Sequence, residues 1–265
     1  MKLAVSTLGM PGQSLGDAIA IAAGNGCDGL ELRLHPDTGV HLDMTEADVA
    51  AANRAITASG LEVLALAGYA RVAAPGPDAP VVEEIVKGLR LADALGARGL
   101  RVFPGGEDTA AAARRIRAAL AETWRPAGVE TLAAARVLVE THDEMATGEA
   151  VVRLLEATGL PEQTGAIWDI LHPWRHGEPP ARTHEALGGW LGYVQIKDAA
   201  SAAEPVPVLL GEGAVPLRAA GELLRAAGYA GWASLEWERT WYPQVGPVTD
   251  VLPGAREWTD TFSFS

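Results

Sequence analysis

Residues 29–34 read Gly29-Leu30-Glu31-Leu32-Arg33-Leu34, with leucine and charged side chains in alternation. A period of two predicts a β-strand whose successive side chains point to opposite faces. Similar short apolar runs recur along the chain, and the stretches between them have the Ala/Leu spacing of helices. This order predicts repeated βα units and a parallel sheet. The eight predicted strands are Lys2–Thr7, Gly29–Leu34, Glu62–Ala67, Gly99–Phe103, Arg136–Thr141, Gly165–Ile170, Tyr193–Lys197 and Trp232–Trp237.

The chain length decides between an open sheet and a closed barrel. Eight units in 265 residues leave about 33 residues per unit, close to the roughly 250 residues of a typical (β/α)8 barrel. No linker or change in composition divides the chain. We therefore expect a single α/β domain over residues 1–265, a (β/α)8 TIM barrel, in which residues 239–265 form a C-terminal tail or last helix.

Helix boundary signals lie between the predicted strands. Thr45-Glu46-Ala47-Asp48 resembles a capping box, and the helix it opens is expected to end at Ser59-Gly60. Further helices are predicted over Pro80–Leu95, Thr109–Glu122, Gly148–Thr158, residues 182–190, Pro216 to Gly228, and about Gly254–Phe262.

Composition limits the class of protein. The chain is 48% hydrophobic, and its 21 Lys and Arg residues against 34 Asp and Glu residues give a net charge of −13. This charge disfavours nucleic acid and anionic membranes as partners. A single cysteine, Cys27, and the lack of a signal peptide or a long apolar run predict a cytoplasmic protein. We expect a small-molecule ligand, and a homodimer is possible.

The inward faces of the predicted strands carry the chemistry. Glu140, Asp169, Gln195 and Glu236 end four different strands on the face expected to point into the barrel. Three carboxylates in one confined site require a cation to remain ionised together. Their all-oxygen donor set predicts one divalent metal ion, Mn²⁺ or Mg²⁺, with Co²⁺ possible and Zn²⁺ less favoured. Alternatively, the carboxylates form ordinary ion pairs with Arg33, Arg101 or Lys197.

The chain resembles the xylose isomerase-like barrel superfamily over essentially its whole length. The motifs that carry the resemblance are Cys27-Asp28-Gly29-Leu30-Glu31-Leu32-Arg33, Val137-Leu138-Val139-Glu140-Thr141-His142, Trp168-Asp169-Ile170-Leu171-His172-Pro173, Tyr193-Val194-Gln195-Ile196-Lys197-Asp198 and Ser234-Leu235-Glu236. The resemblance implies that Glu140, Asp169, Gln195 and Glu236 are the metal ligands, and that Glu140 and Glu236 also move protons. Gln195 departs from the family pattern, which usually has histidine there. Some members that dehydrate 3-dehydroshikimate are similar in this respect.

The resemblance also implies a reaction class. Members abstract a proton from a carbon next to a carbonyl, and the metal stabilises the resulting enediolate. We expect a sugar or polyol isomerase or epimerase. One alternative is a dehydratase of a cyclic hydroxy-ketone, of the 3-dehydroshikimate or inosose type. The other is a non-catalytic barrel that binds a small ligand. The superfamily's endonucleases use additional histidine ligands, and the third strand, within Leu61–Tyr69, offers none.

Two histidines and a tryptophan follow the strand ends. His142 shares the inward parity of Glu140 and is a natural catalytic proton carrier near neutral pH; the alternative is a hydrogen-bonded packing residue. His172 is expected to contact a substrate oxygen. Residues 171–184 are aromatic and predict a lid, in which Trp174 either stacks on a sugar face or packs in the loop.

Three further polar residues are expected to line the substrate pocket. Lys197 would bind a substrate oxygen, or else form an ion pair with Glu236 or Glu238. Glu31 and Arg33 would line the same pocket, or else form a structural network with each other.

Overall fold

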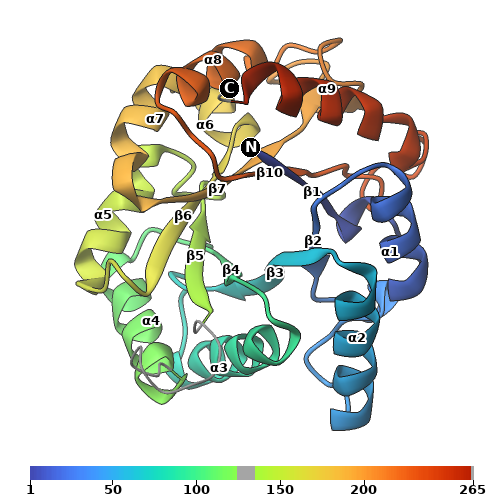
Figure 1. Cartoon of the computed structure of the whole chain (residues 1–265). Helices are drawn as coiled ribbons and strands as arrows, with labels where there is room; N and C mark the ends of the chain where they lie inside the picture. Colours follow the sequence, from blue (N-terminus) through green and yellow to red (C-terminus); the bar gives the residue numbers. More distant parts are fainter. Residues whose placement is uncertain (124–134, 264–265) are drawn as a thin grey trace.

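Eight parallel strands close into a barrel. The computed structural model describes residues 1–123 and 135–263, and Figure 1 shows the strands at the centre with helices around them. In spatial order the strands run β1-β10-β7-β6-β5-β4-β3-β2, with β2 closing on β1. This confirms the predicted (β/α)8 barrel. The strands are β1 (Lys2–Ser6), β2 (Gly29–Arg33), β3 (Glu62–Arg71), β4 (Gly99–Phe103), β5 (Arg136–Glu140), β6 (Thr164–Asp169), β7 (Leu191–Ile196) and β10 (Trp232–Leu235).

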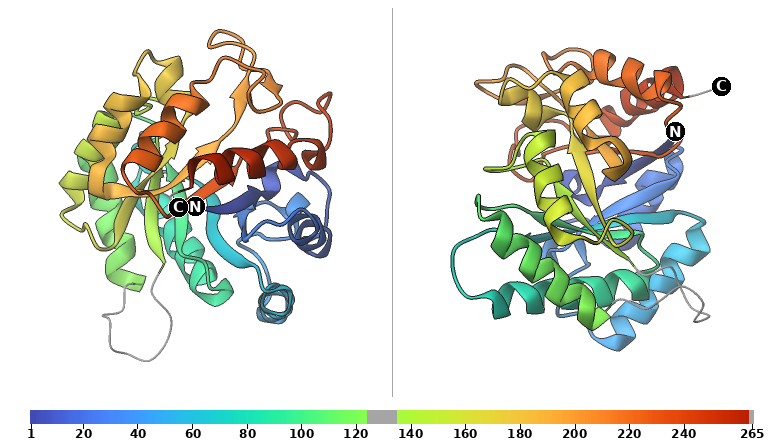
Figure 2. Two further views of the ribbon diagram at one scale, coloured as in Figure 1. Left: turned by 45° about the horizontal axis from the view of Figure 1, so that its top comes forward. Right: turned by 90° about the vertical axis from the view of Figure 1, so that its left-hand side faces the viewer.

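Helices cover the outside of the barrel, as both views in Figure 2 show. They are α1 (Leu15–Gly24), α2 (Glu46–Ser59), α3 (Asp78–Leu95), α4 (Thr109–Thr123), α5 (Gly148–Thr158), α6 (Leu171–Arg175), α7 (Pro180–Leu187), α8 (Leu217–Ala226) and α9 (Leu252–Phe262). Short 3₁₀ turns lie at Thr7–Gly9, Pro36–Thr38, Gly188–Trp190 and Val248–Asp250. Among the described residues, none of the helices has both the length and the apolar character needed to cross a bilayer.

The predicted helices agree with the structure with three differences. The capping box at Thr45 is present, with Asp48 returning the hydrogen bond, and Gly60 ends α2 in the left-handed region at φ 75°. Helix α1 was not predicted. Helix α7 begins and ends earlier than residues 182–190, because Pro179-Pro180 starts it and Gly188 ends it. Residues 171–184, expected as a lid loop, instead contain α6 and the first half of α7.

The alternating side chains of the strands point to opposite faces of the barrel wall, as predicted from the sequence. Leu30 and Leu32 belong to the large core between the barrel and its helices. The barrel interior holds a separate apolar cluster of Ala4, Leu64, Ala65, Leu138, Ile167, Tyr193 and Trp232. Glu140 follows Leu138 by two residues on the same face. The apolar cluster inside the barrel therefore lies below a layer of polar side chains at the carboxyl ends of the strands.

The C-terminal segment packs against the barrel wall. Helix α9 packs against α8 and β1, and Ser263 accepts a hydrogen bond from the terminal amine of Met1 at 2.7 Å. Figure 2 shows α9 beside β1. The expected last helix is therefore present, and it packs on the outside of the barrel next to the first strand.

The buried carboxylate of Asp198 holds the segment that follows β7, residues 199–215, through hydrogen bonds. Asp198 accepts hydrogen bonds from the backbone amides of Gly211 at 2.8 Å, Gly213 at 3.1 Å and Val215 at 3.1 Å. Asp198 also starts the small antiparallel pair β8 (Asp198–Ala199) and β9 (Pro207–Val208). Because Asp198 follows Lys197 directly, the same fold fixes the backbone of that lysine at the barrel mouth.

Candidate active site

Four side chains predicted as metal ligands meet at the carboxyl ends of their strands. Glu140 ends β5, Asp169 ends β6, Gln195 lies in β7, and Glu236 follows β10. All four are at most 3% exposed. Asp169 is paired with Gln195 in the register of β6 and β7, and Gln195 with Ser234 in that of β7 and β10. The four side chains therefore stand at the ends of neighbouring strands, as strand parity predicts. Among the described residues, however, the potential ligand atoms that lie within 4.8 Å of one another belong to Glu140, His142 and His172, and not to Glu140, Asp169 and Glu236.

Two cations lie among these carboxylates. Arg101 Nη1 is 3.1 Å from Glu140 Oε2 and 3.3 Å from Glu236 Oε1. Lys197 Nζ is 2.7 Å from Asp169 Oδ2, 2.5 Å from Glu236 Oε2 and 2.7 Å from Glu238 Oε1. The ion pairs considered as alternatives for Arg101 and Lys197 are thus both formed.

The site nevertheless has an excess of negative charge. Two cations face the buried or partly buried carboxyl groups of Glu31, Glu140, Asp169, Glu236 and Glu238. Burial raises the pKa of Glu140 well above its usual value, against the opposing effect of Arg101. Although burial alone would raise the pKa of Asp169, the Lys197 ammonium and His172 hold it below its usual value. This imbalance is relieved either by protonation, which the raised pKa values of Glu140 and Glu31 favour, or by a bound cation.

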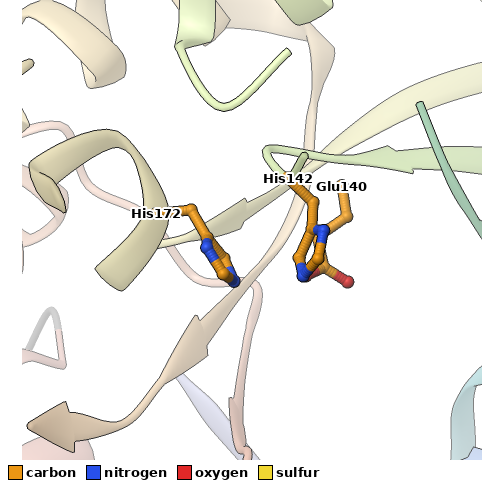
Figure 3. Close-up of side chains that lie close together, drawn as sticks. All are labelled: Glu140, His142 and His172. Carbon is orange, nitrogen blue, oxygen red and sulfur yellow. The ribbon is translucent and has the colours of Figure 1, made fainter. Parts of the chain in front are cut away.

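Two histidines stand beside Glu140 at the mouth. Figure 3 shows the side chains of Glu140, His142 and His172 pointing toward one another. One potential ligand atom from each lies within 4.8 Å of the others, and the two imidazole rings meet edge-on with centroids 4.2 Å apart. Burial and the nearby His172 lower the pKa of His142 to about 4. The His142 ring is therefore neutral near pH 7, and the same low pKa makes it a weak base there.

The backbone after Glu140 is shaped to hold His142. Among the described residues, Asp143 is the one non-glycine residue with a positive φ, at 49°. Its carboxylate lies 2.8 Å from His142 Nδ1. A left-handed aspartate in this place is a local strain of the kind found at functional sites. Because the Asp143 carboxylate contacts Nδ1 of His142, Nε2 is the ring nitrogen available to a substrate or a metal.

Four buried atoms of the site residues named above have no hydrogen-bond partner among the described residues. They are Glu31 Oε2, Asp169 Oδ2, His172 Nε2 and Gln195 Oε1. His172 Nε2 lies 3.3 Å from Asp169 Oδ2, and Lys197 Nζ lies 2.7 Å from it, but neither contact has hydrogen-bond geometry. Each of these atoms can give a lone pair to a cation. The residues present therefore fit a divalent metal ion.

Three predicted substrate-binding residues have contacts that refine their roles. Arg33 Nη1 donates to both carboxylate oxygens of Asp37, at 2.8 and 2.9 Å, and Arg33 Nε donates to Tyr69 Oη at 2.6 Å. The alternative of an Arg33–Glu31 network is therefore wrong, because the Arg33 side chain extends toward Asp37 in the following 3₁₀ turn. Glu31 instead accepts a hydrogen bond from Gln195. Trp174 lies in α6, partly buried and packed against the outer core, and its contact with a substrate stays a prediction.

A continuous stack of aromatic rings and arginines lines part of the mouth. Arg33 lies between the rings of Trp241 (5.4 Å) and Tyr69 (5.6 Å), and Arg101 lies over Tyr69 (5.6 Å) and Phe103 (4.3 Å). Phe103 in turn contacts His142, with centroids 4.5 Å apart. Tyr69, Phe103 and Trp241 were not predicted as site residues. The available signal was that Phe103 ends a strand and Tyr69 lies near the end of one.

The chain matches known proteins by family model and by fold. A family model described as xylose isomerase-like TIM barrel matches residues 19–262. No curated protein matches the sequence. A probable 3-DHS dehydratase, AsbF, of Bacillus anthracis has TM-score 0.75 and 21% identity, covering 98% of this chain and 99% of that one.

Two further solved structures are similar over nearly the whole chain. A D-allulose 3-epimerase from Methylomonas sp. has TM-score 0.75 and 18% identity, covering 99% of this chain and 98% of its own. The IolI protein with a bound zinc atom has TM-score 0.76 and 17% identity, covering 99% and 98%. These likenesses show the fold, and the structural neighbours include epimerases, a dehydratase and a zinc-bound protein. The family-model match over residues 19–262 shows that the chain belongs to the xylose isomerase-like TIM barrel family.

Proposed function

We propose that the chain is a divalent-metal-dependent enzyme that removes a proton from a carbon next to a carbonyl group in a sugar, polyol or cyclic hydroxy-ketone. The observation that carries the proposal is the meeting of Glu140, His142 and His172 within 4.8 Å, next to buried atoms that lack hydrogen-bond partners. A neutral imidazole, a carboxylate and a cation site at the carboxyl ends of barrel strands are the parts that this reaction needs.

The proposed ligands of the metal are Glu140, Asp169, Gln195 and Glu236. Their oxygen atoms suit Mn²⁺ or Mg²⁺. His142 and His172 are an alternative pair of ligands beside Glu140, and a site with two nitrogens would instead favour Zn²⁺. When bound, the ion would offset the negative charge that develops on the substrate oxygen after proton removal.

The protein side chains have distinct roles in this proposal. His142 takes the proton, because Asp143 holds its ring through Nδ1 and its ring lies beside Glu140 at the mouth of the site. Lys197 and Arg101 stay protonated, because neighbouring carboxylates raise the pKa of each against the effect of burial. They bind oxygen atoms of the substrate and neutralise Glu236. His172 lies next to His142 and is placed to donate a proton.

Between the two reaction outcomes, we favour dehydration over the isomerase or epimerase expected from the sequence. A 3-epimerase-type reaction needs proton carriers on opposite faces of one carbon, with Glu140 and Glu236 as the pair. Both of these carboxylates contact the same Arg101 nitrogen, and Glu236 also contacts Lys197 and Gln195. His142 and His172 are instead adjacent, which suits removal of a proton and protonation of a nearby leaving hydroxyl.

A substrate panel tests this proposal. Purified protein with Mn²⁺ would be incubated with ketoses, inososes and 3-dehydroshikimate in D₂O. Dehydration predicts the appearance of a conjugated product that absorbs in the ultraviolet. Deuterium incorporation next to the carbonyl without new absorbance would favour the isomerase or epimerase instead. Absence of both across the panel, with no bound metal, would leave the non-catalytic barrel as the better description.

A further inference from the structure

Glu31 makes a contact across the barrel interior that the proposed chemistry does not explain. It lies on β2 and is fully buried. Its Oε1 accepts a hydrogen bond from Gln195 Nε2, on β7, at 3.0 Å. In the barrel order, β1 and β10 separate β2 from β7, so this bond spans the interior. The same Gln195 nitrogen lies 3.2 Å from Glu236 Oε1.

These two carboxylates determine which way the Gln195 amide points. An amide has a donating end, its NH₂ group, and an accepting end, its carbonyl oxygen. The NH₂ nitrogen of Gln195 is the end within hydrogen-bond distance of both Glu31 and Glu236, so one end of the amide faces the two carboxyl groups. The other end of the amide, Oε1, is left buried and without a hydrogen-bond partner among the described residues.

We propose that Glu31 is a positioning residue that fixes the Gln195 amide with its carbonyl oxygen presented as a ligand for the cation. This inference rests on the metal site proposed above, and it explains how an amide side chain can act as a metal ligand in that site. An amide in the reversed orientation would present NH₂ hydrogens to the cation and repel it. Glu236 alone does not ensure the orientation, because its Oε1 also receives Arg101. Glu31, on β2, is the second hydrogen-bond acceptor that holds the Gln195 NH₂ group in place.

Nuclear magnetic resonance of the side-chain amides tests the orientation without any metal. The Gln195 signals are assigned by their loss in Gln195→Leu. We expect one sharp pair of NH₂ signals in the wild type. In Glu31→Gln, the new amide can accept or donate, so both orientations of Gln195 become possible, and its signals should double or broaden. A single sharp pair at unchanged shifts in Glu31→Gln would overturn the proposal.

Calorimetric titration with Mn²⁺ then measures whether the orientation matters for binding. Glu31→Gln is expected to weaken the affinity about tenfold, as loss of an outer-sphere partner does. The control variant Glu238→Gln removes a charge from the same site without changing a partner of Gln195. It should weaken the Mn²⁺ affinity only about twofold, because the effect of a charge is smaller when the group is partly solvated. Thermal unfolding of each variant verifies that it is folded.

A double-mutant cycle separates orientation from charge. On the Gln195→Leu background, Glu31→Gln can act through charge alone, so its effect should fall to about twofold. An equal loss on both backgrounds would overturn the orienting role of Glu31. If the wild type binds neither Mn²⁺, Mg²⁺ nor Zn²⁺, the proposed function fails, while the amide signals still decide whether Glu31 fixes Gln195.

Discussion

The ammonium nitrogen of Lys197 lies 2.7 Å from Asp169 Oδ2, at the centre of the carboxylates that the barrel collects at its mouth. Lys197 is 4% exposed, and Asp169 is fully buried. The same nitrogen also contacts Glu236 and Glu238. In the protein without a bound ion, this one cation therefore balances much of the charge of the proposed metal site.

Replacing Lys197 should destabilise the protein in a way that a divalent ion repairs. Lys197→Met removes a partner from a buried ion pair and is expected to cost about 3–5 kcal/mol of unfolding free energy without metal. Urea unfolding with and without Mn²⁺ measures this, with Lys87→Met on the exposed surface of α3 as the control. A loss below about 1 kcal/mol, which is the range of surface pairs, or no recovery with Mn²⁺, would contradict the charge balance described above.

The neutral state of His142 predicts how stability depends on pH. Burial lowers its pKa to about 4, from an unfolded value near 6.5. Between these values the unfolded chain binds more protons than the folded one, so the stability contributed above pH 6.5 falls as the pH drops toward 4. The loss attributable to His142 is of order 3 kcal/mol. Urea unfolding of the wild type and His142→Gln across this range measures it. Parallel curves for the two proteins would show that His142 does not titrate as described.

The sequence predicted the barrel and which side chains point into it. It did not predict which of these side chains contact one another. Alternation in β5 fixed the inward face of Leu138 and Glu140, because a strand has only two faces. Which cation meets which carboxylate depends on the length and rotamers of side chains from different strands, and this information is absent from the spacing. Hence Arg101 bridging Glu140 and Glu236 was only one of several alternatives.

Two other features were missed for different reasons. Helix α1 is rich in alanine and apolar on most of its surface, so it lacks a clear stripe; the capping box of Ser14 with Asp17 was the available signal. Trp241 lies on a segment without periodicity, and only the folded chain places it over Arg33. Pairing between distant segments of this kind cannot be read from local patterns.

The carboxylate of Asp198 should control the order of the segment that follows β7. Asp198→Ala removes the acceptor for the amides of Gly211, Gly213 and Val215. The expected cost is about 2–3 kcal/mol, since the buried amide of Val215 and two part-buried bonds lose their partner. Denaturant unfolding gives the cost, and limited proteolysis should show new cleavage within residues 199–215. The exposed Glu204→Ala serves as the control. Unchanged proteolysis of Asp198→Ala would mean that other contacts order this segment.

Cys27 should be unreactive in the folded protein. Burial raises the pKa of its thiol to about 11, and the side chain is buried. Because the thiolate is the reactive form, alkylation by iodoacetamide at about pH 8 should be slow in the native protein and fast in guanidinium chloride. Mass spectrometry follows the labelling. Comparable rates in both conditions would show that Cys27 is accessible.

Metal binding by wild type and Glu140→Gln decides whether the barrel mouth holds a divalent ion through Glu140. Glu140 belongs to both proposed ligand sets and is 1% exposed, so the isosteric change removes a ligand charge with little change of shape. Elemental analysis and calorimetric titration of the purified proteins should give one divalent ion per wild-type chain and an affinity at least about tenfold weaker in Glu140→Gln. A wild-type chain that binds no divalent ion, or a Glu140→Gln variant that binds it equally well, would contradict the account.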